Sequence, residues 1–235
     1  MNSWTRGTLF VVAIFVVAGC SNKDQSQSQS VTGMSREDEL IRASAPDDFD
    51  KGAEVQPNFQ TRLAAARLLE AQGNLPGAAM QYDEALKLER DNVEALYRLG
   101  ILRTTMKQYE LVIDAWQRYT KATQKSPVGY GNLGFCYELA NQPEQAEQTY
   151  RKGVQRDPAN QFVRVNFGLM LARLDRIDEA QEQLGAVLPP AAVFYNIASV
   201  YEQRGMTEQA REWYRKSLQS DSNFRDAKAR LAAID

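Results

Sequence analysis

Apolar residues recur at helical spacing along most of the chain after residue 57. In the clearest segment, positions i, i+3, i+4 and i+7 are occupied by Tyr130, Leu133, Gly134 and Tyr137. Residues with this spacing lie on one side of an α-helix, because the helix completes a turn in about 3.6 residues. The pattern predicts amphipathic helices, each with an apolar stripe that packs against a neighbouring helix.

The same pattern returns at intervals of 34 residues, with one shorter interval, which indicates a series of similar units. Small residues occupy one slot in the first half of each unit: Ala66, Gly100, Gly134, Gly168 and Ala198. A second slot, in the second half, carries Ala78, Ala146, Ala180 and Ala210. Four residues after that slot come the bulky side chains Tyr82, Trp116, Tyr150 and Tyr214. The small residues allow two helices to cross closely, and the bulky ones are expected to fill the space between units.

Residues 127–160 resemble the tetratricopeptide repeat (TPR) pattern W-x2-L-G-x2-Y…A-x3-F…P, with Tyr130 in place of the tryptophan. The resemblance implies an all-α fold: a right-handed TPR superhelix, or α-solenoid, of about five helix–turn–helix units. The expected units are residues 59–92, 93–126, 127–160, 161–190 and 191–224, and the expected capping helix is residues 225–235. Because no helix pair buries its apolar stripe alone, stacked units share one continuous core.

Two units depart from the pattern. The second unit carries Arg103, Val112 and Tyr119 at pattern positions, which predicts looser packing or a different helix angle there. The fourth unit is four residues short and ends in Leu188-Pro189-Pro190. This shortening is expected to bring the fifth unit closer. It is either a tolerated deletion or a bend that shapes the binding groove.

The N-terminus resembles a bacterial lipoprotein signal. Arg6 precedes an apolar run of about ten residues that ends in Val17-Ala18-Gly19-Cys20. The run is too short to span a membrane but is typical of a signal peptide. The resemblance implies that residues 1–19 are removed and that Cys20 is the lipid attachment site. The alternative is a cytosolic protein with an apolar N-terminal helix and a chance cysteine.

Residues 20–56 are expected to form a flexible polar tether that begins at the lipidated cysteine. Alternating serine and glutamine cannot bury enough apolar surface to become ordered. Ser35 and Asp38 favour a short helix, which Pro46, Asp47 and Asp48 end. Ser21, after the cysteine, implies by the lipoprotein resemblance an outer-membrane location facing the periplasm.

Composition argues against catalysis and against nucleic acid as a partner. The net charge is −2 and the chain has no histidine, so neither a phosphate-binding surface nor the commonest general base is present. No pattern indicates a metal, a cofactor or a small-molecule substrate. Cys136 is expected to be buried and inert. A clamp for an acidic peptide would need several cations together, and only Arg98 and Arg173 qualify, two units apart.

Candidate binding residues follow from the TPR resemblance, because the first helix of each unit lines the concave face on which partner peptides lie. Three asparagines share one slot in successive units: Asn132, Asn166 and Asn196. Side-chain amides both donate and accept hydrogen bonds, so this ladder is expected to pair with the backbone of an extended peptide. The alternative is that the amides bond within the array. Apolar anchors expected on the same face are Tyr97, Ile101, Phe135, Leu139, Leu169 and Tyr195.

The order of these segments predicts a membrane-anchored scaffold rather than an enzyme. Signal, tether and about five TPR units resemble lipoproteins of pilus and secretion machines. The tight-adherence (Tad) pilus lipoprotein and the type IV pilus pilotin are the nearest kinds, and residues 190–198 are similar to the Tad kind. The resemblance implies an envelope partner such as a secretin or a pilus or secretion component. The alternative is an adaptor that recruits envelope proteases or peptidoglycan hydrolases.

Overall fold

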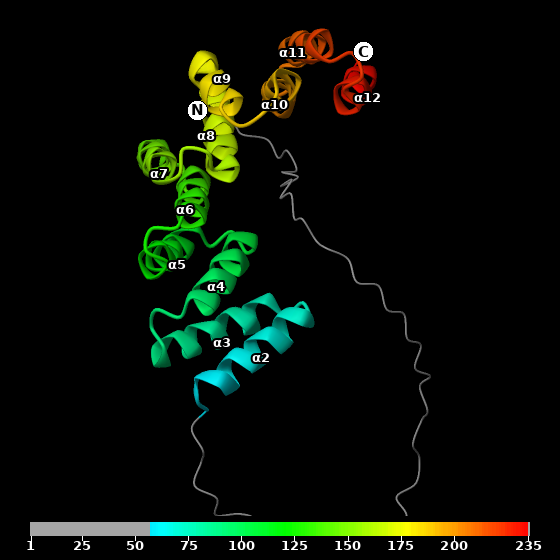
Figure 1. The fold of residues 1–235 in the computed structure, drawn as a ribbon. Coiled ribbons are helices and arrows are strands. Elements are labelled where there is room, and N and C mark those ends of the chain that lie inside the picture. Colours follow the sequence, from blue (N-terminus) through cyan, green and yellow to red (C-terminus); the bar gives the residue numbers. More distant parts are fainter. Residues whose placement is uncertain (1–56, 235) are drawn as a thin grey trace, which may run out of the picture. The chain divides into compact units, whose positions relative to one another are not determined.

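The computed structural model describes residues 57–234, and every secondary-structure element within this range is an α-helix (Figure 1). In chain order the elements are α2 (Phe59–Ala71), α3 (Leu75–Leu88), α4 (Val93–Thr105), α5 (Tyr109–Ala122), α6 (Pro127–Leu139), α7 (Pro143–Arg156), α8 (Gln161–Arg173), α9 (Ile177–Gly185), α10 (Pro190–Gln203), α11 (Thr207–Ser220) and α12 (Arg225–Ile234). The all-α prediction is confirmed. In this range no helix has the length and apolar character needed to cross a membrane. The predicted signal, lipid site and tether lie outside the described residues.

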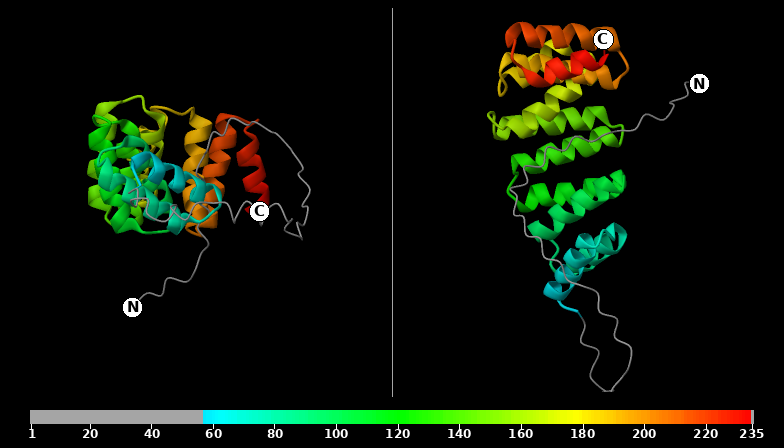
Figure 2. Two further views of the ribbon diagram at one scale, coloured as in Figure 1. Left: turned by 90° about the horizontal axis from the view of Figure 1, so that it is seen from below. Right: turned by 90° about the vertical axis from the view of Figure 1, so that its right-hand side faces the viewer.

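The helices form antiparallel pairs that follow one another in chain order (Figure 2). Each even-numbered helix from α2 to α10 packs against the odd-numbered helix that follows it, and α12 packs on α11. Each unit expected from the sequence contains one such pair. Below, the unit of α2 and α3 is called the first unit, and that of α10 and α11 the fifth.

Local capping explains where several helices begin. At α2, the Asn58 side chain accepts a hydrogen bond from the backbone N–H of Thr61 at 2.9 Å. The equivalent caps of α3, α4 and α8 are Asn74, Asn92 and Asn160. An asparagine cap satisfies an N–H group that has no partner within the helix. Three other helices, α6, α7 and α10, begin with proline, whose fixed φ suits the first turn.

The small residues predicted in the first helices lie where the paired helix crosses. A Cβ atom added to Gly134 would lie 2.7 Å from the Tyr150 ring, and one added to Gly100 would lie 2.5 Å from the Trp116 ring. A Cβ on Gly168 would lie 2.6 Å from Leu184 Cγ. These separations are shorter than van der Waals contact, so a larger side chain would push the two helices apart.

The second unit shows no loosening of its core, although its sequence departs from the pattern. Val112 and Trp116 are fully buried. Arg103 pairs with both carboxylate oxygens of Asp83 in α3, at 2.7 and 2.8 Å, and also donates to the Leu111 carbonyl. An ion pair to the first unit thus takes the place of the aromatic packing that the repeat pattern predicts at this position.

In the fourth unit the deletion falls on the second helix. Helix α9 has nine residues, whereas α3, α5, α7 and α11 each have fourteen. Helix α10 begins a few residues after α9 ends and packs against both α8 and α9. The fifth unit therefore follows directly on the shortened pair, and Leu184 at the end of α9 joins its core cluster.

Candidate protein-binding faces

The predicted asparagine ladder lies on the first helices of the third, fourth and fifth units. All three side chains are half-buried. Asn132 Nδ2 donates to the Val128 carbonyl at 3.0 Å, and Asn196 Nδ2 donates to the Ala192 carbonyl at 2.8 Å. Two of the three amide donors are therefore used within their own helix. Their Oδ1 atoms remain as acceptors for backbone N–H groups of a ligand.

The predicted apolar anchors divide into two kinds. Tyr97 meets Trp116 edge to face, with ring centroids 5.6 Å apart, and Tyr195 packs on Tyr214 at 5.6 Å. Ile101 and Leu169 are likewise partly buried against core clusters. These four side chains stabilise the array as well as reaching its surface.

Phe135 and Leu139 form the second kind. Both are half-buried on α6, and neither belongs to a core cluster of the described residues. The other four predicted anchors pack against core clusters, whereas these two side chains do not. A partner would gain most by covering them.

The sequence analysis missed Phe162, whose ring packs on Gly131, one helical turn before Phe135 on α6. Its side chain is 43% exposed. A Cβ atom added to Gly131 would lie 2.4 Å from Phe162 Cε1, so the ring rests directly on the backbone of α6. The sequence feature that could have indicated Phe162 is a glycine on the predicted binding face of one unit, followed by an apolar residue near the start of the next unit.

Three units share a group formed by tyrosine, glutamate and arginine. In the third unit, Tyr150 Oη donates to Glu138 at 2.7 Å, and Arg173 of the fourth unit pairs with the same carboxylate at 2.5 Å. The equivalent groups are Tyr82, Glu70 and Arg98 at the first unit, and Tyr214, Glu202 and Arg230 at the fifth. Burial raises the pKa of the Tyr150 hydroxyl well above its usual value, and the nearby Glu138 carboxylate raises it further. Each group ties two helices of one unit to the next unit.

The charged side chains on the face formed by the first helices, here called the first-helix face, are held in these groups. Arg98 and Arg173, the two cations considered for a peptide clamp, are both held in ion pairs. Glu138 and Glu202 are paired as described, and Glu94 pairs with Arg67. What this face offers a partner is therefore amide, hydroxyl and apolar chemistry.

A second candidate face lies on the second helices, between α3 and α5. A cavity of about 600 Å³ is lined by Pro76, Ala79, Met80, Asp83, Glu84, Leu86, Lys87, Arg103, Met106, Gln108, Leu111 and Arg118. At its rim Met80 is 57% exposed and Leu111 is 53% exposed. Here this group of residues is called the outer cavity. The sequence analysis did not predict this cavity, although Arg103, which lines it, departs from the repeat pattern.

Cys136 is buried in the core of the second and third units. Burial raises the pKa of its thiol to about 11, although a contact with Thr104 Oγ1, 3.7 Å from the sulfur, acts in the opposite direction. A thiol with this pKa holds its proton at neutral pH, so the side chain acts as a small apolar residue. Within residues 57–234, no three acidic, histidine or cysteine side chains gather in a way that could hold a metal ion.

Family models of the tetratricopeptide repeat match three stretches of the chain, residues 66–105, 129–160 and 191–224. These stretches carry Gly100 and Gly134, two of the three crossing glycines described above. The chain carries tetratricopeptide repeats in these stretches. TPR arrays are surfaces for protein–protein interaction, so this TPR protein is a scaffold in the broad sense.

Solved TPR proteins share this fold. YrrB, described as a TPR protein with an unusual peptide-binding site, is 25% identical with a TM-score of 0.52, covering 72% of this chain and 89% of its own. MamA is 19% identical with a TM-score of 0.56, covering 70% of this chain and 92% of its own. The likeness to MamA concerns the fold alone.

Curated relatives match part of the TPR array. The general transcriptional corepressor trfA of Dictyostelium discoideum is 25% identical over 51% of this chain, and the BBSome complex member BBS4 of Bos taurus is 28% identical over 60%. The chain spans 9% and 27% of the lengths of these two relatives. What they share with this TPR protein is the repeat.

Proposed function

We propose that this TPR protein is a lipid-anchored scaffold of the bacterial cell envelope that binds an extended segment of a protein partner. The Val17-Ala18-Gly19-Cys20 motif supports the anchor, and the polar sequence of residues 21–33 supports a tether between lipid and array. The TPR array supports the binding role.

The observation that carries the binding role is the neutral first-helix face. Its charges are paired within the array, which leaves the asparagine ladder beside Phe135, Leu139 and Phe162. Amide acceptors recognise backbone N–H groups of any sequence, and apolar side chains gain free energy when a partner covers them. The ligand that suits this face is an extended segment with apolar side chains and little charge.

The proposed partner is a component of a pilus or secretion machine, such as a secretin. This step rests on the resemblance of the whole segment order to Tad-type lipoproteins and pilotins. A photo-crosslinking residue at position 135 or 162 in living cells is expected to capture such a component. Gln148, exposed on α7, provides the matched control. Capture of envelope proteases or peptidoglycan hydrolases alone would overturn the pilus assignment in favour of an adaptor role.

The asparagine ladder has its own test. Replacing Asn132, Asn166 and Asn196 together by alanine is expected to abolish capture at position 135 while the helical circular dichroism signal is kept. Undiminished capture by the triple variant would exclude the ladder. For the anchor, Cys20→Ser is expected to prevent lipid labelling and membrane fractionation, and continued membrane retention would contradict it.

A further inference from the structure

The three asparagines of the ladder lie on first helices that pack directly on one another. Helix α8 packs on α6 on one side and on α10 on the other. The Phe162 ring of α8 rests on the backbone of α6, and Val200 of α10 is buried in the core cluster of the third and fourth units. Helices in direct contact lie about 8–10 Å apart. Because Asn132, Asn166 and Asn196 share one slot, successive asparagines are separated by about this distance.

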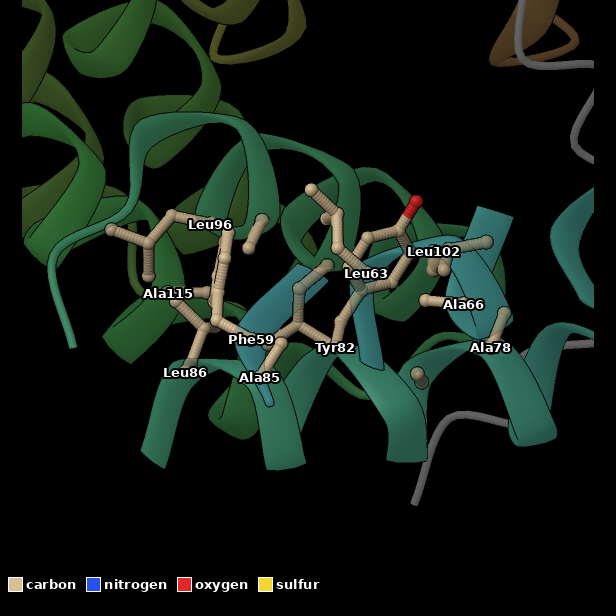
Figure 3. Packing of buried hydrophobic residues seen from close by; sticks show 13 residues of the cluster. Phe59, Leu63, Ala66, Ala78, Tyr82, Ala85, Leu86, Leu96, Leu102 and Ala115 are labelled. Carbon is tan, nitrogen blue, oxygen red and sulfur yellow. The ribbon is translucent and has the colours of Figure 1, made fainter. Parts of the chain in front are cut away.

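The ladder is confined to the third, fourth and fifth units. In the first two units the same slot holds Ala64 and Arg98, and Arg98 is paired with Glu70. The residue before this slot in the first unit, Leu63, is buried with Tyr82 in the cluster that Figure 3 shows. The first unit therefore offers a ligand neither an amide at this slot nor an apolar side chain at the one before it.

The middle asparagine of the ladder differs from its two neighbours. Asn132 and Asn196 each donate a hydrogen bond to the carbonyl four residues earlier in their own helix. Within residues 57–234, the Asn166 side chain has no hydrogen-bond partner. It therefore offers a ligand both a donor and an acceptor, whereas each outer asparagine offers its acceptor.

The spacing of the three amides selects the backbone conformation of a ligand that pairs with all of them. An α-helical ligand is excluded, because its backbone N–H groups are already bonded within the helix. A β-strand presents the same side at every second residue, about 6.6 Å, or at every fourth, about 13 Å, and neither distance matches the spacing of the helices. A polyproline II helix presents the same side at every third residue, about 9.3 Å, and its N–H and C=O groups form no internal hydrogen bonds. This conformation matches the separation of about 8–10 Å.

We propose that the asparagine ladder binds a protein segment in the polyproline II conformation, three residues of which span one unit of the array. This inference rests on the proposed function of the first-helix face and specifies the ligand of that face. Every third residue of the segment donates its N–H group to an asparagine, so proline is excluded at those positions and tolerated at the others. The middle one of these residues also accepts a hydrogen bond from Asn166 Nδ2. Apolar side chains at every third position lie along Phe135 and Leu169, which share one slot in the third and fourth units.

Two fluorescent peptides of identical composition test the three-residue period. The first carries phenylalanine at every third position between serine and glutamine, and the second carries the same residues with phenylalanine at every second position. Fluorescence anisotropy with the full-length protein in detergent is expected to show that the first peptide binds about tenfold more tightly. The variant with alanine at positions 132, 166 and 196 measures background binding, and it is expected to bind both peptides equally. Equal affinities of the unaltered protein, tighter binding of the second peptide, or no binding above background would overturn the proposal.

N-methylation of the first peptide tests the backbone hydrogen bonds separately from the apolar contacts. Methylating the N–H group of every third residue gives three peptides, one for each register. One of the three is expected to lose binding and the other two to keep it, because a single N–H group in each turn faces the ladder. The three peptides carry the same number of methyl groups, so each is a control for the others. Equal losses in all three registers would contradict the proposed pairing.

Single variants of the protein test the middle asparagine. Asn166→Ala is expected to weaken binding of the first peptide about tenfold, and Asn132→Ala and Asn196→Ala about threefold each, because the middle amide loses two hydrogen bonds and each outer amide loses one. Gln148→Ala, at an exposed position on α7, is the control and is expected to leave binding unchanged. A larger effect at an outer asparagine would overturn the assignment of the two-sided contact to Asn166.

These measurements separate the inference from the proposed function. If a partner is captured at position 135 in cells but the first peptide shows no preference, the polyproline II ligand is excluded and the binding role of the face stands. If neither capture nor peptide binding is observed, both are overturned.

Discussion

Neighbouring units of this TPR array are joined in two different ways. In the third unit the slot after the helix crossing is Tyr150, whose hydroxyl reaches Glu138 and, through it, Arg173 of the next unit. In the second and fourth units the same slots hold Trp116 and Leu184, with Thr104 and Ala172 where the glutamate would be. Odd units are thus joined to the next unit by a polar group, and even units present only apolar volume at that slot. In both kinds of unit the two helices pack as a pair, although α9 in the fourth unit is shorter.

This alternation shows that the repeat pattern determines the size of the side chain at the position of Tyr150 and its equivalents. It does not determine whether that side chain is polar or apolar. A ring or a branched aliphatic side chain fills the space equally well. The hydroxyl of tyrosine must find a partner once it is buried. In the odd units this partner is a glutamate on the first helix, and an arginine neutralises the glutamate. The glutamate and the arginine are therefore paired with each other rather than available to a ligand.

The largest effect is expected from emptying an apolar slot. Trp116 is 1% exposed, and Trp116→Ala is expected to lower the free energy of unfolding by about 3–5 kcal/mol, since it leaves a large cavity. Urea unfolding followed by circular dichroism measures this. Trp116→Phe, which keeps most of the volume and removes an indole N–H that has no partner among the described residues, is the matched control and is expected to cost much less. Equal losses in both would contradict the volume argument.

A smaller loss is expected from breaking a polar group. Glu138→Ala would leave Arg173 and the buried Tyr150 hydroxyl without their shared partner, at a cost of about 2–3 kcal/mol. Tyr150→Phe keeps the ion pair and is expected to cost about 1 kcal/mol. Glu144→Ala, at an exposed position in the first turn of α7, is expected to cost less than about 1 kcal/mol, because it loses only the favourable interaction of an acid with the helix dipole. If Glu138→Ala proved as mild as Glu144→Ala, the polar joint would have no energetic role.

The acid response of the junction between α7 and the fourth unit gives a further test. Hydrogen bonds from Arg176 lower the pKa of Glu147 from 4.5 to about 2, against the opposing effect of burial and with help from Arg151. Because the folded-state pKa is depressed, this stabilisation is complete above pH 4.5 and is lost as the pH falls toward 2. Glu147→Gln is expected to destabilise the protein at neutral pH and to approach the parent near the acid limit. A constant difference across that range in urea unfolding would contradict the assignment.

The sequence predicted the crossing residues and the helix pairs, because size and spacing are local and repeat in register. It could not predict the polar groups, since their arginine comes from different slots. Arg98 and Arg230 follow their glutamates by 28 residues, whereas Arg173 follows Glu138 by 35, because Asn166 occupies the usual slot. The slot of the asparagine ladder is therefore the one that carries arginine beside the first and fifth units. The outer cavity was not predicted for a similar reason, because it depends on two exposed positions in different units that only the fold brings together.

The smallest effect concerns the turn between paired helices, where odd and even units also differ. This turn has a positive φ in all five units: Gly73, Asn141 and Gly205 in the odd ones, and Lys107 and Asp175 in the even ones. Glycine adopts such a φ without strain, whereas a lysine does so at a cost of about 1 kcal/mol. Lys107→Gly is therefore expected to raise the free energy of unfolding by about that amount. Asp175→Gly is expected to gain nothing, because Arg204 pairs with both oxygens of Asp175 at 2.9 Å and would lose them. Equal gains from the two glycine variants in urea unfolding would mean that the Asp175 pair contributes nothing and that backbone strain alone distinguishes the even turns.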